Sequence, residues 1–517
     1  MLLSPIIVLV GGSFLTYLFL SYLLQLHRHR KQAKAWHCEP CPGGSRGLFG
    51  IPAFLALNKA VREKRWIDHL SNLYGVYGLT FHNTIFGRPM VNTIEPENIK
   101  AILATQFQDF SLGTRHREFY PLLGDGIFTL DGAGWSHARG LLRPQFTRDQ
   151  VADLALLDDH ITHLINLIPK DRTAFDIQRL FFLFTLDSAT HFLFGESVGC
   201  MRPESETTGV LAKSAVRNAQ GFADAFTIGQ DCLASRSRAQ GLYWLVNPKK
   251  FQEANRQVHE VVDHYVRVAL QKKRDPNRKD SSRYIFLDAL AADTDDPKLL
   301  RDNMLNILLA GRDTTASLLS SVFYYLARNE QVWSRLRREI VGIFGDSMDP
   351  HTEVTQTKLK DIPYLRYVLN ETLRLQPPVP MNFRVATKDT TLPVGGGADR
   401  KSPVYVRKGS MCTYSVFAMH RRTDIWGQDA RSFRPERWEE NAKHGWDYLP
   451  FNGGPRICLG QQYALTEASY TIIRLMQHFD TLDNADHNGR EEPVKLSNLT
   501  MMHDEGVAVR LYSSEKI

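Results

Sequence analysis

Residues 451–460 read Phe-Asn-Gly-Gly-Pro-Arg-Ile-Cys-Leu-Gly, and the architecture of the chain can be worked out from this stretch. Its cysteine, Cys458, has Arg456 two positions before it and Gly460 two positions after it. An amphipathic run with apolar residues at helical spacing follows from Gln461 to about Phe479. A thiolate just before a helix N-terminus is stabilised by the helix dipole and by free backbone N–H groups. Cys458 is therefore a candidate ligand for iron.

The same stretch resembles the haem-binding loop of cytochromes P450, whose pattern is Phe, two residues, Gly, one, Arg, one, Cys, one, Gly. The matching positions are Phe451, Gly454, Arg456, Cys458 and Gly460. The resemblance implies haem b as the cofactor, with the cysteine thiolate as axial ligand and the arginine on a propionate. The glycines would let the backbone pass close to the macrocycle. A buried free cysteine near a turn is the alternative for any single cysteine, and five matched positions argue against it.

A second motif lies in a long apolar segment. Asp296 is a good N-cap and Pro297 suits the first helical position, so a helix is predicted from there to about Asn329. Midway it reads Ala-Gly-Arg-Asp-Thr-Thr at 310–315. A glycine, an acid and two β-branched threonines are an unusual choice inside an apolar helix.

This second motif resembles the oxygen-activation groove of P450s. The resemblance implies that Ala310 and Gly311 leave room for dioxygen. It also implies that Asp313 and Thr314 relay protons to the oxygen. The alternative is a core helix that a threonine hydroxyl bends by bonding to a carbonyl one turn back.

Three further residues are candidates for holding the haem carboxylates. Trp135 and Arg139 stand at i and i+4 on one face of a predicted helix. Their spacing resembles helix C of P450s, which implies that both bind a propionate. Arg384, in Asn-Phe-Arg at 382–384, matches the family position that donates to the second propionate. Tryptophan and arginine at this spacing also occur on many unrelated helices.

A third motif predicts a structural network. Pro363 opens a helix that contains Glu371 and Arg374 at i and i+3. This Glu-x-x-Arg resembles helix K of P450s, where the pair joins an arginine that Arg437 matches here. The implied Glu–Arg–Arg network would fix the segment that holds the cysteine loop. A surface ion pair, worth at most about 1 kcal/mol, is the alternative.

Bulk properties place the chain among ordinary globular proteins. It has 517 residues, 43% hydrophobic and 23% charged, with a formal net charge of +7. No long basic stripe with interleaved aromatic residues appears, so nucleic acid is not an expected partner. Six cysteines are too few for a disulfide scaffold. Cys38 and Cys41 form one Cys-x-x-Cys without the second pair that a zinc site needs.

The first residues predict a membrane anchor. Leu2 to Leu26 contain no charged side chain, and a span needs about 20 apolar residues. Arg28, Arg30 and Lys31 follow directly. A cleavable signal peptide, the alternative, would carry its basic residues first and a shorter apolar region of about 7–15 residues. Positive charge stays cytoplasmic, so the prediction is a single-pass protein of the endoplasmic reticulum membrane whose catalytic domain faces the cytosol.

The predicted organisation has three parts: a transmembrane anchor at 1–26, a basic and Pro/Gly-rich hinge at 27–49, and a haem monooxygenase domain at 50–517. The resemblance to P450s covers the chain from about Gly43 onward. It implies a mainly α fold with small β-sheets, a helix-rich triangular prism around the haem.

The resemblance is strongest to fungal P450s that hydroxylate n-alkanes and fatty acids, on residues 300–316, 389–397 and 418–427. It implies hydroxylation of a long aliphatic lipid at a terminal or near-terminal carbon. Oxidation of a polyketide or terpenoid intermediate is the alternative. A P450-fold isomerase or a non-catalytic haem binder would not need the acid and alcohol at 313 and 314.

Electron transfer requires a partner, because the chain has no dinucleotide-binding fingerprint of its own. The resemblance implies NADPH–cytochrome P450 reductase, with cytochrome b5 as an optional second donor. The reductase would dock on the face below Cys458, where Arg139 and Arg143 could meet acidic groups. Contacts to a hydrophobic substrate are expected from regions near 110–128, 222–245, 310–315, 379–383 and 499–503.

Overall fold

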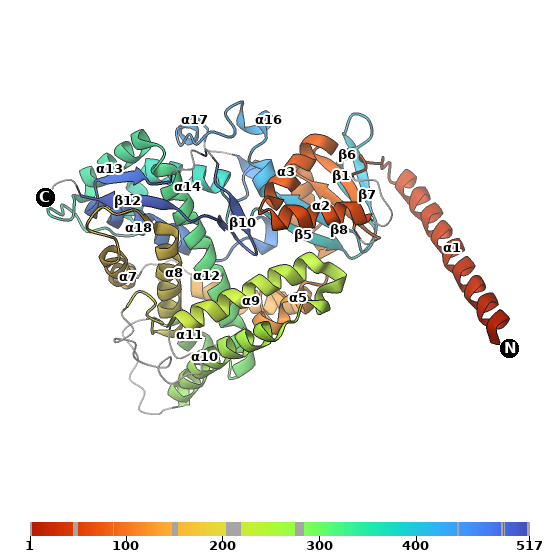
Figure 1. The fold of residues 1–517 in the computed structure, drawn as a ribbon, viewed down its shortest axis with the longest axis horizontal. Coiled ribbons are helices and arrows are strands. Elements are labelled where there is room, and N and C mark those ends of the chain that lie inside the picture. Colours follow the sequence, from red (N-terminus) through yellow and green to blue (C-terminus); the bar gives the residue numbers. More distant parts are fainter. Residues whose placement is uncertain are drawn as a thin grey trace. The chain divides into compact units, whose positions relative to one another are not determined.

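The computed structural model describes residues 3–44, 50–85, 87–146, 153–202, 219–274, 284–441, 444–486, 490 and 492–513. The described residues are mainly helical with small sheets, which confirms the predicted fold class (Figure 1). The α-helices are α1 (Leu3–Ala35), α2 (Ile51–Arg62), α3 (Trp66–Tyr77), α4 (Pro96–Lys100), α5 (Arg115–Leu123), α6 (Gly132–Leu142), α7 (Leu154–Asn166), α8 (Ile177–Phe194), α9 (Ala219–Ala239), α10 (Lys249–Arg274), α11 (Phe286–Asp293), α12 (Pro297–Leu326), α13 (Glu330–Phe344), α14 (Pro363–Leu375), α15 (Val416–Met419), α16 (Thr423–Trp426), α17 (Arg437–Glu440) and α18 (Gln461–His478). The strands are β1 (Thr80–Ile85), β2 (Arg88–Thr93), β3 (Phe110–Ser111), β4 (Phe175–Asp176), β5 (Met381–Ala386), β6 (Thr390–Gly396), β7 (Ser402–Val406), β8 (Met411–Ser415), β9 (Thr481–Asn484), β10 (Lys495–Ser497), β11 (Met501–His503) and β12 (Ala508–Tyr512).

The chain forms two compact units. The first comprises residues 1–58, 70–111 and 383–415. Its main sheet has the strand order β1-β2-β8-β5-β3, with β1 and β2 antiparallel and β2 and β8 parallel. A separate antiparallel hairpin joins β6 and β7. Gly395 lies near the turn of this hairpin and, like Gly397, has a positive φ, which favours glycine.

The N-terminal segment of the first unit is a long helix followed by residues hydrogen-bonded to the strands. Helix α1 includes the basic residues up to Lys34. After it, the Glu39 amide donates to the Pro403 carbonyl at 2.9 Å, and the Gly44 amide donates to the His82 carbonyl at 2.6 Å. Residues 36–44 therefore form a strap along the strands, while 45–49 lie outside the described residues.

The predicted transmembrane helix at 1–26 is not confirmed. Across the residues that the structure describes, no helix has the combination of length and hydropathy that crossing a membrane requires.

The second unit comprises residues 59–69, 112–382 and 416–517, and two of its hydrophobic clusters are large. Helix α12 contributes its first half to one cluster and its second half to the other. As predicted, Asp296 caps this helix, accepting from the Lys298 and Leu299 amides at 2.9 and 3.2 Å. Thirty residues give α12 a length of about 45 Å. The helix is buried on nearly all sides, which is why its sequence shows little polar periodicity.

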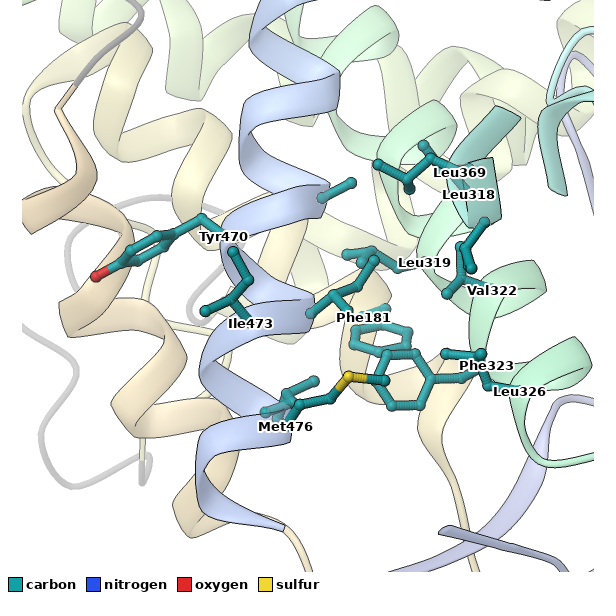
Figure 2. Packing of buried hydrophobic residues seen from close by; sticks show 14 of the residues in the cluster. Phe181, Leu318, Leu319, Val322, Phe323, Leu326, Leu369, Tyr470, Ile473 and Met476 are labelled. Carbon is teal, nitrogen blue, oxygen red and sulfur yellow. The ribbon is translucent and has the colours of Figure 1, made fainter. Parts of the chain in front are cut away.

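The cluster around the second half of α12 ties it to the helix after the cysteine loop. Figure 2 shows Met476 of α18 pointing toward Phe181 of α8 and Phe323 of α12. The rings of Phe181 and Phe323 lie 5.2 Å apart between centroids. All three side chains are fully buried, so α18 and α12 are fixed against one another by a dry interface.

Two local predictions from the sequence, a strand-like stretch from Tyr74 to Phe86 and helix throughout from Val151 to Gly195, were wrong in part. The strand-like stretch from Tyr74 is still part of α3 up to Tyr77, and β1 begins only at Thr80. The segment 151–195 is not helical throughout, because α7 ends at Asn166 and β4 precedes α8. There Asp176 caps α8 by accepting from the Gln178 amide at 3.0 Å.

Candidate active site

The loop that carries Cys458 is closed by its own backbone. The Cys458 amide donates to the Phe451 carbonyl at 3.1 Å. Between them a short 3-10 turn spans Gly454–Arg456, and Gly454 has φ of +68°, a conformation that favours glycine. Gly460 stands at the N-cap position of α18. The five matched positions therefore build one tight turn directly before a helix N-terminus.

Cys458 is exposed, although protein surrounds it on most sides. Burial raises the pKa of its thiol, while the Gly460 backbone and the Arg139 guanidinium lower it. Cys458 is therefore accessible and at the same time partly desolvated by the protein around it. That environment fits a thiolate beneath a flat iron-bearing group, because iron(III) would replace the missing solvation.

A cationic and aromatic cluster stands beside the loop. The Arg456 guanidinium lies 4.4 Å from the ring centroid of Trp135, and the Arg139 guanidinium lies 5.8 Å from it. Arg139 also donates to the Ile457 carbonyl at 3.0 Å. The structure thus brings together three of the four residues predicted to hold propionates, and two arginines beside an indole suit a ligand with carboxylates.

Arg456 has a partner that the sequence did not indicate. Its guanidinium donates to Asp131 Oδ1 at 2.7 Å and to the Leu130 carbonyl at 2.9 Å. Asp131 lies at the N-cap position of α6 and is exposed. Nothing in the spacing of positions 131 and 456 could have signalled this ion pair.

Arg384 belongs to the first unit, on β5. Its side chain is buried, and Nη1 donates to the Phe383 carbonyl at 2.7 Å.

The motif in α12 interrupts an otherwise sealed helix. From Asp302 to Leu326, every residue is buried except Ala310, Gly311 and Thr314. Positions i, i+1 and i+4 share one face of a helix, so these three residues face an accessible space. An added Cβ at Gly311 would meet only Ala189, at 3.8 Å, so protein packing alone does not demand glycine there.

The acid and alcohol of this motif differ in environment. Thr314 Oγ1 donates to the Ala310 carbonyl at 2.6 Å, the bond to the preceding turn that the sequence predicts. Asp313 is buried and points off the accessible face. Burial raises the pKa of its carboxyl, and the Arg312 guanidinium acts in the opposite direction.

The Glu–Arg–Arg residues meet in one buried cluster. Glu371 accepts from Arg374 Nε and Nη2 at 2.9 and 2.8 Å and from Arg437 Nε at 2.9 Å. The Trp438 indole donates to the same carboxylate at 3.1 Å. Arg437 also binds Asp429 Oδ2 at 3.1 Å. Charged groups without exposure have to be satisfied in this way, so the cluster fixes the chain around residues 429–438.

A buried histidine extends this cluster toward the cysteine loop. His420 Nε2 accepts from the Leu449 amide at 2.9 Å, and Nδ1 faces the Arg374 carbonyl at 3.1 Å. Burial lowers its pKa well below the usual range, so the ring is neutral and can act as donor and acceptor at once. The sequence reading missed this connection.

A second buried acid was also missed. Glu467 of α18 accepts from Ser188 of α8 at 2.5 Å and lies next to Thr315 of α12. Burial raises its pKa to about 7. An acidic residue on the apolar face of the predicted helix after Cys458 was the available signal, because carboxylates are rarely buried without a partner.

Comparison with known proteins agrees with this geometry. The cytochrome P450 family model matches residues 46–506. The chain belongs to the cytochrome P450 family. Cytochrome P450 52A12 of Debaryomyces hansenii is 51% identical over 482 residues, covering 92% of each chain. Cytochrome P450 52A5 of Candida maltosa is 55% identical over 438 residues, 84% of this chain and 82% of the relative. Cytochrome P450 52A6 of Candida tropicalis is 50% identical over 438 residues, 84% of this chain and 83% of the relative.

This P450 is therefore a monooxygenase, and its cofactor is haem with a cysteine thiolate as axial ligand. The predicted P450 fold is confirmed.

Proposed function

We propose that this P450 hydroxylates long-chain fatty acids or n-alkanes at a terminal or near-terminal carbon. The observation that carries the proposal is the accessible face within the buried stretch 302–326 of α12, where Ala310, Gly311 and Thr314 are the residues not buried. The residues at 300–316, 389–397 and 418–427 resemble those of fungal P450s that act on such lipids. Relatives about half identical over most of the chain add support.

The proposed roles follow from the contacts. Cys458 holds the haem iron, while Trp135, Arg139 and Arg456 hold a haem carboxylate. Arg384 is the candidate for the second carboxylate. When bound, the haem supplies the site at which dioxygen is reduced. Binding of a propionate would compete with Asp131 for Arg456, so we expect this ion pair to lengthen in the haem-loaded enzyme.

The acid and the alcohol handle protons. Hydroxylation of a C–H bond by dioxygen places one oxygen atom in the product hydroxyl and releases the other as water. It consumes two electrons, which come from NADPH through the reductase, and two protons. Thr314 presents its hydroxyl to the accessible face, and Asp313 next to it provides a buried carboxyl that can pass on a proton.

The partners and location are part of the same proposal. NADPH–cytochrome P450 reductase, with cytochrome b5 as an optional donor, would dock near Arg139 and Arg143. The uncharged segment Leu2 to Leu26 and the basic residues that follow it support attachment to the endoplasmic reticulum membrane, with the catalytic domain in the cytosol.

The test is product analysis in a reconstituted system. The full chain, purified reductase and NADPH are incubated with a saturated long-chain fatty acid or an n-alkane, and products are identified by mass spectrometry. We expect a hydroxyl group at or next to the terminal methyl carbon. Turnover of polyketide or terpenoid substrates with no lipid product would overturn the substrate class in favour of secondary metabolism.

A further inference from the structure

Glu467 of α18 is a buried carboxyl group without a counter-charge. The residue is 1% exposed, and its polar neighbours are the hydroxyls of Ser188 on α8 and Thr315 on α12. Burial in this position raises its pKa from the ordinary 4.5 to about 7. A carboxyl group that changes its charge near neutral pH inside a protein is a candidate for a functional role.

The titratable and charged side chains on the helices around Glu467 have other partners. They are Asp187 on α8, held by the Cys200 and Met201 amides, His191 on α8, paired with His160 on α7, Asp153, which caps α7, Asp158 on α7, paired with Arg474 of α18, Arg337 on α13, bound to the Met476 and Phe479 carbonyls, and Arg312 and Asp313 on α12, which face each other. On α18 itself, Tyr463 lies one turn before Glu467, and both burial and the charge of Glu467 raise its pKa, so it stays neutral. Within the described part of the chain, no cation compensates an ionised Glu467.

Ser188 can serve both protonation states of Glu467. Its Oγ lies 2.5 Å from Glu467 Oε1 and 3.3 Å from the Thr185 carbonyl oxygen. The hydroxyl donates to the ionised carboxylate. It accepts from the protonated carboxyl group, and its own hydrogen then turns to the Thr185 carbonyl. Glu467 can therefore gain or lose a proton without leaving its buried partner unsatisfied.

Glu467 connects the two elements that carry the proposed haem contacts. It is the seventh residue of α18, the helix that follows the Cys458 loop, so it stands about 9 Å along the helix axis from Gln461. Thr315, which it adjoins, directly follows Thr314 on α12. A change of charge at the iron would reach Glu467 through the protein interior, where charges are screened less than in water.

Reduction of the iron is such a change. Two negative charges of the porphyrin ring and one of the thiolate cancel those of iron(III), whereas iron(II) leaves one negative charge uncompensated. An added negative charge disfavours the ionised form of a nearby carboxyl group. It therefore increases the affinity of that group for a proton.

We propose that Glu467 binds a proton when the haem iron is reduced, so that one electron and one proton enter the protein together. The electron comes from the reductase and the proton from bulk water, and the only bond formed is the O–H bond of the carboxyl group. The inference goes beyond the proposed function, since it depends on haem bound through Cys458 and not on the substrate. Its consequence is a reduction potential that depends on pH.

The first test is a potentiometric titration of the full haem-loaded chain between pH 5.5 and pH 8.5. We expect the midpoint potential of the wild type to be constant below about pH 6 and to fall above about pH 7, where an ionised Glu467 must bind a proton on reduction. Glu467→Gln is neutral at every pH and should lose this dependence. Asp158→Asn is the matched control, because Asp158 lies beside the same helix but is 39% exposed and paired with Arg474. It should retain the wild-type dependence.

The second test observes the proton directly. Reduced-minus-oxidised infrared difference spectra of the wild type at pH 8 should gain the C=O stretching band of a protonated carboxyl group. The band should be absent from Glu467→Gln and present in Asp158→Asn. A wild-type spectrum without it would overturn the inference.

The remaining outcomes are equally decisive. A midpoint potential that is independent of pH in the wild type, or equally dependent on pH in Glu467→Gln, would overturn the inference, because another group or none would then bind the proton. Should Glu467→Gln fail to bind haem, Ser188→Ala takes its place. It removes the donor to the ionised form and should move the pH dependence to higher pH, and an unmoved dependence would count against Glu467. Absence of hydroxylated lipid refutes the proposed substrate class alone and leaves both redox measurements as they are.

Discussion

Arg374 holds Glu371 through two parallel hydrogen bonds, Nε to Oε2 at 2.9 Å and Nη2 to Oε1 at 2.8 Å, and neither side chain is exposed to solvent. The same carboxylate neutralises Arg437. One buried anion thus faces two buried cations, and Arg437 is paired with Asp429 as well.

Replacing Glu371 should lower the free energy of unfolding substantially. We expect Glu371→Ala to destabilise the folded chain by about 3–5 kcal/mol, because Arg374 would be left buried without a counter-charge. Arg437 would keep only its ion pair with Asp429. Urea unfolding, followed together with retention of the haem absorbance, measures the loss. A cost below about 1 kcal/mol would contradict a structural role.

A matched control exists on α10. Glu253 and Arg256 have the same i, i+3 spacing, and about half of each side chain is exposed. Glu253→Ala should leave the free energy of unfolding nearly unchanged, because solvent screens an exposed ion pair. The two pairs share residue types and spacing, so the comparison shows what burial and the additional contacts of Glu371 to Arg437 and Trp438 contribute.

Cysteine replacements test the iron ligand. The reduced wild-type protein with carbon monoxide should show the red-shifted Soret band of thiolate-ligated haem, and Cys458→Ala should lose it. Cys232→Ala is the control, because this cysteine is buried on α9 and belongs to a hydrophobic cluster. Loss of the band in both variants would point to misfolding, and its retention in Cys458→Ala would refute the ligand assignment.

The hydroxyl of Thr314 is expected to couple electron transfer to product. Thr314→Ala should raise hydrogen peroxide released per NADPH and lower product, measured side by side in the reconstituted system. Thr185 of α8 makes the same bond to the preceding turn, to the Phe181 carbonyl at 3.0 Å. Thr185→Ala should therefore leave coupling unchanged, and an unchanged ratio in Thr314→Ala would exclude the relay.

Glu467 should make stability depend on pH. Its pKa is about 7 in the folded chain, against an ordinary value of 4.5, so the folded state binds more protons between these values. Stability is then full below pH 4.5 and falls as the pH rises through 7, by about 3 kcal/mol in total. Glu467→Gln should remove this loss, which urea unfolding of both proteins at pH 5 and pH 8 can check. If the free energies of unfolding of the wild type and of Glu467→Gln differ by the same amount at both pH values, the raised pKa of Glu467 is contradicted.

Local signals explain why parts of the fold could be predicted. The start of α12 follows from Asp296 and Pro297, and α14 is bounded by the prolines at 363 and 377. The helix after Cys458 was confirmed to within one residue. Each of these depends on residues within one or two turns of the element.

The wrong or missing predictions depend on distant partners. The break between α7 and α8 contains β4, which pairs with β12 more than 300 residues later. The Arg456–Asp131 ion pair and the contact between Glu467 and Ser188 join segments that are far apart in the sequence. Single-sequence periodicity carries no information on which helices meet, so these could not be foreseen.

The strap at residues 36–44 bears on how the protein should be shortened for crystallography. Its amides complete hydrogen bonds to Pro403 and His82 on two strands of the first unit. A version that starts beyond Gly44 would expose those strand edges and invite aggregation. A version that starts near Trp36 would lack the apolar segment Leu2–Leu26 and would keep the strap hydrogen-bonded to the strands.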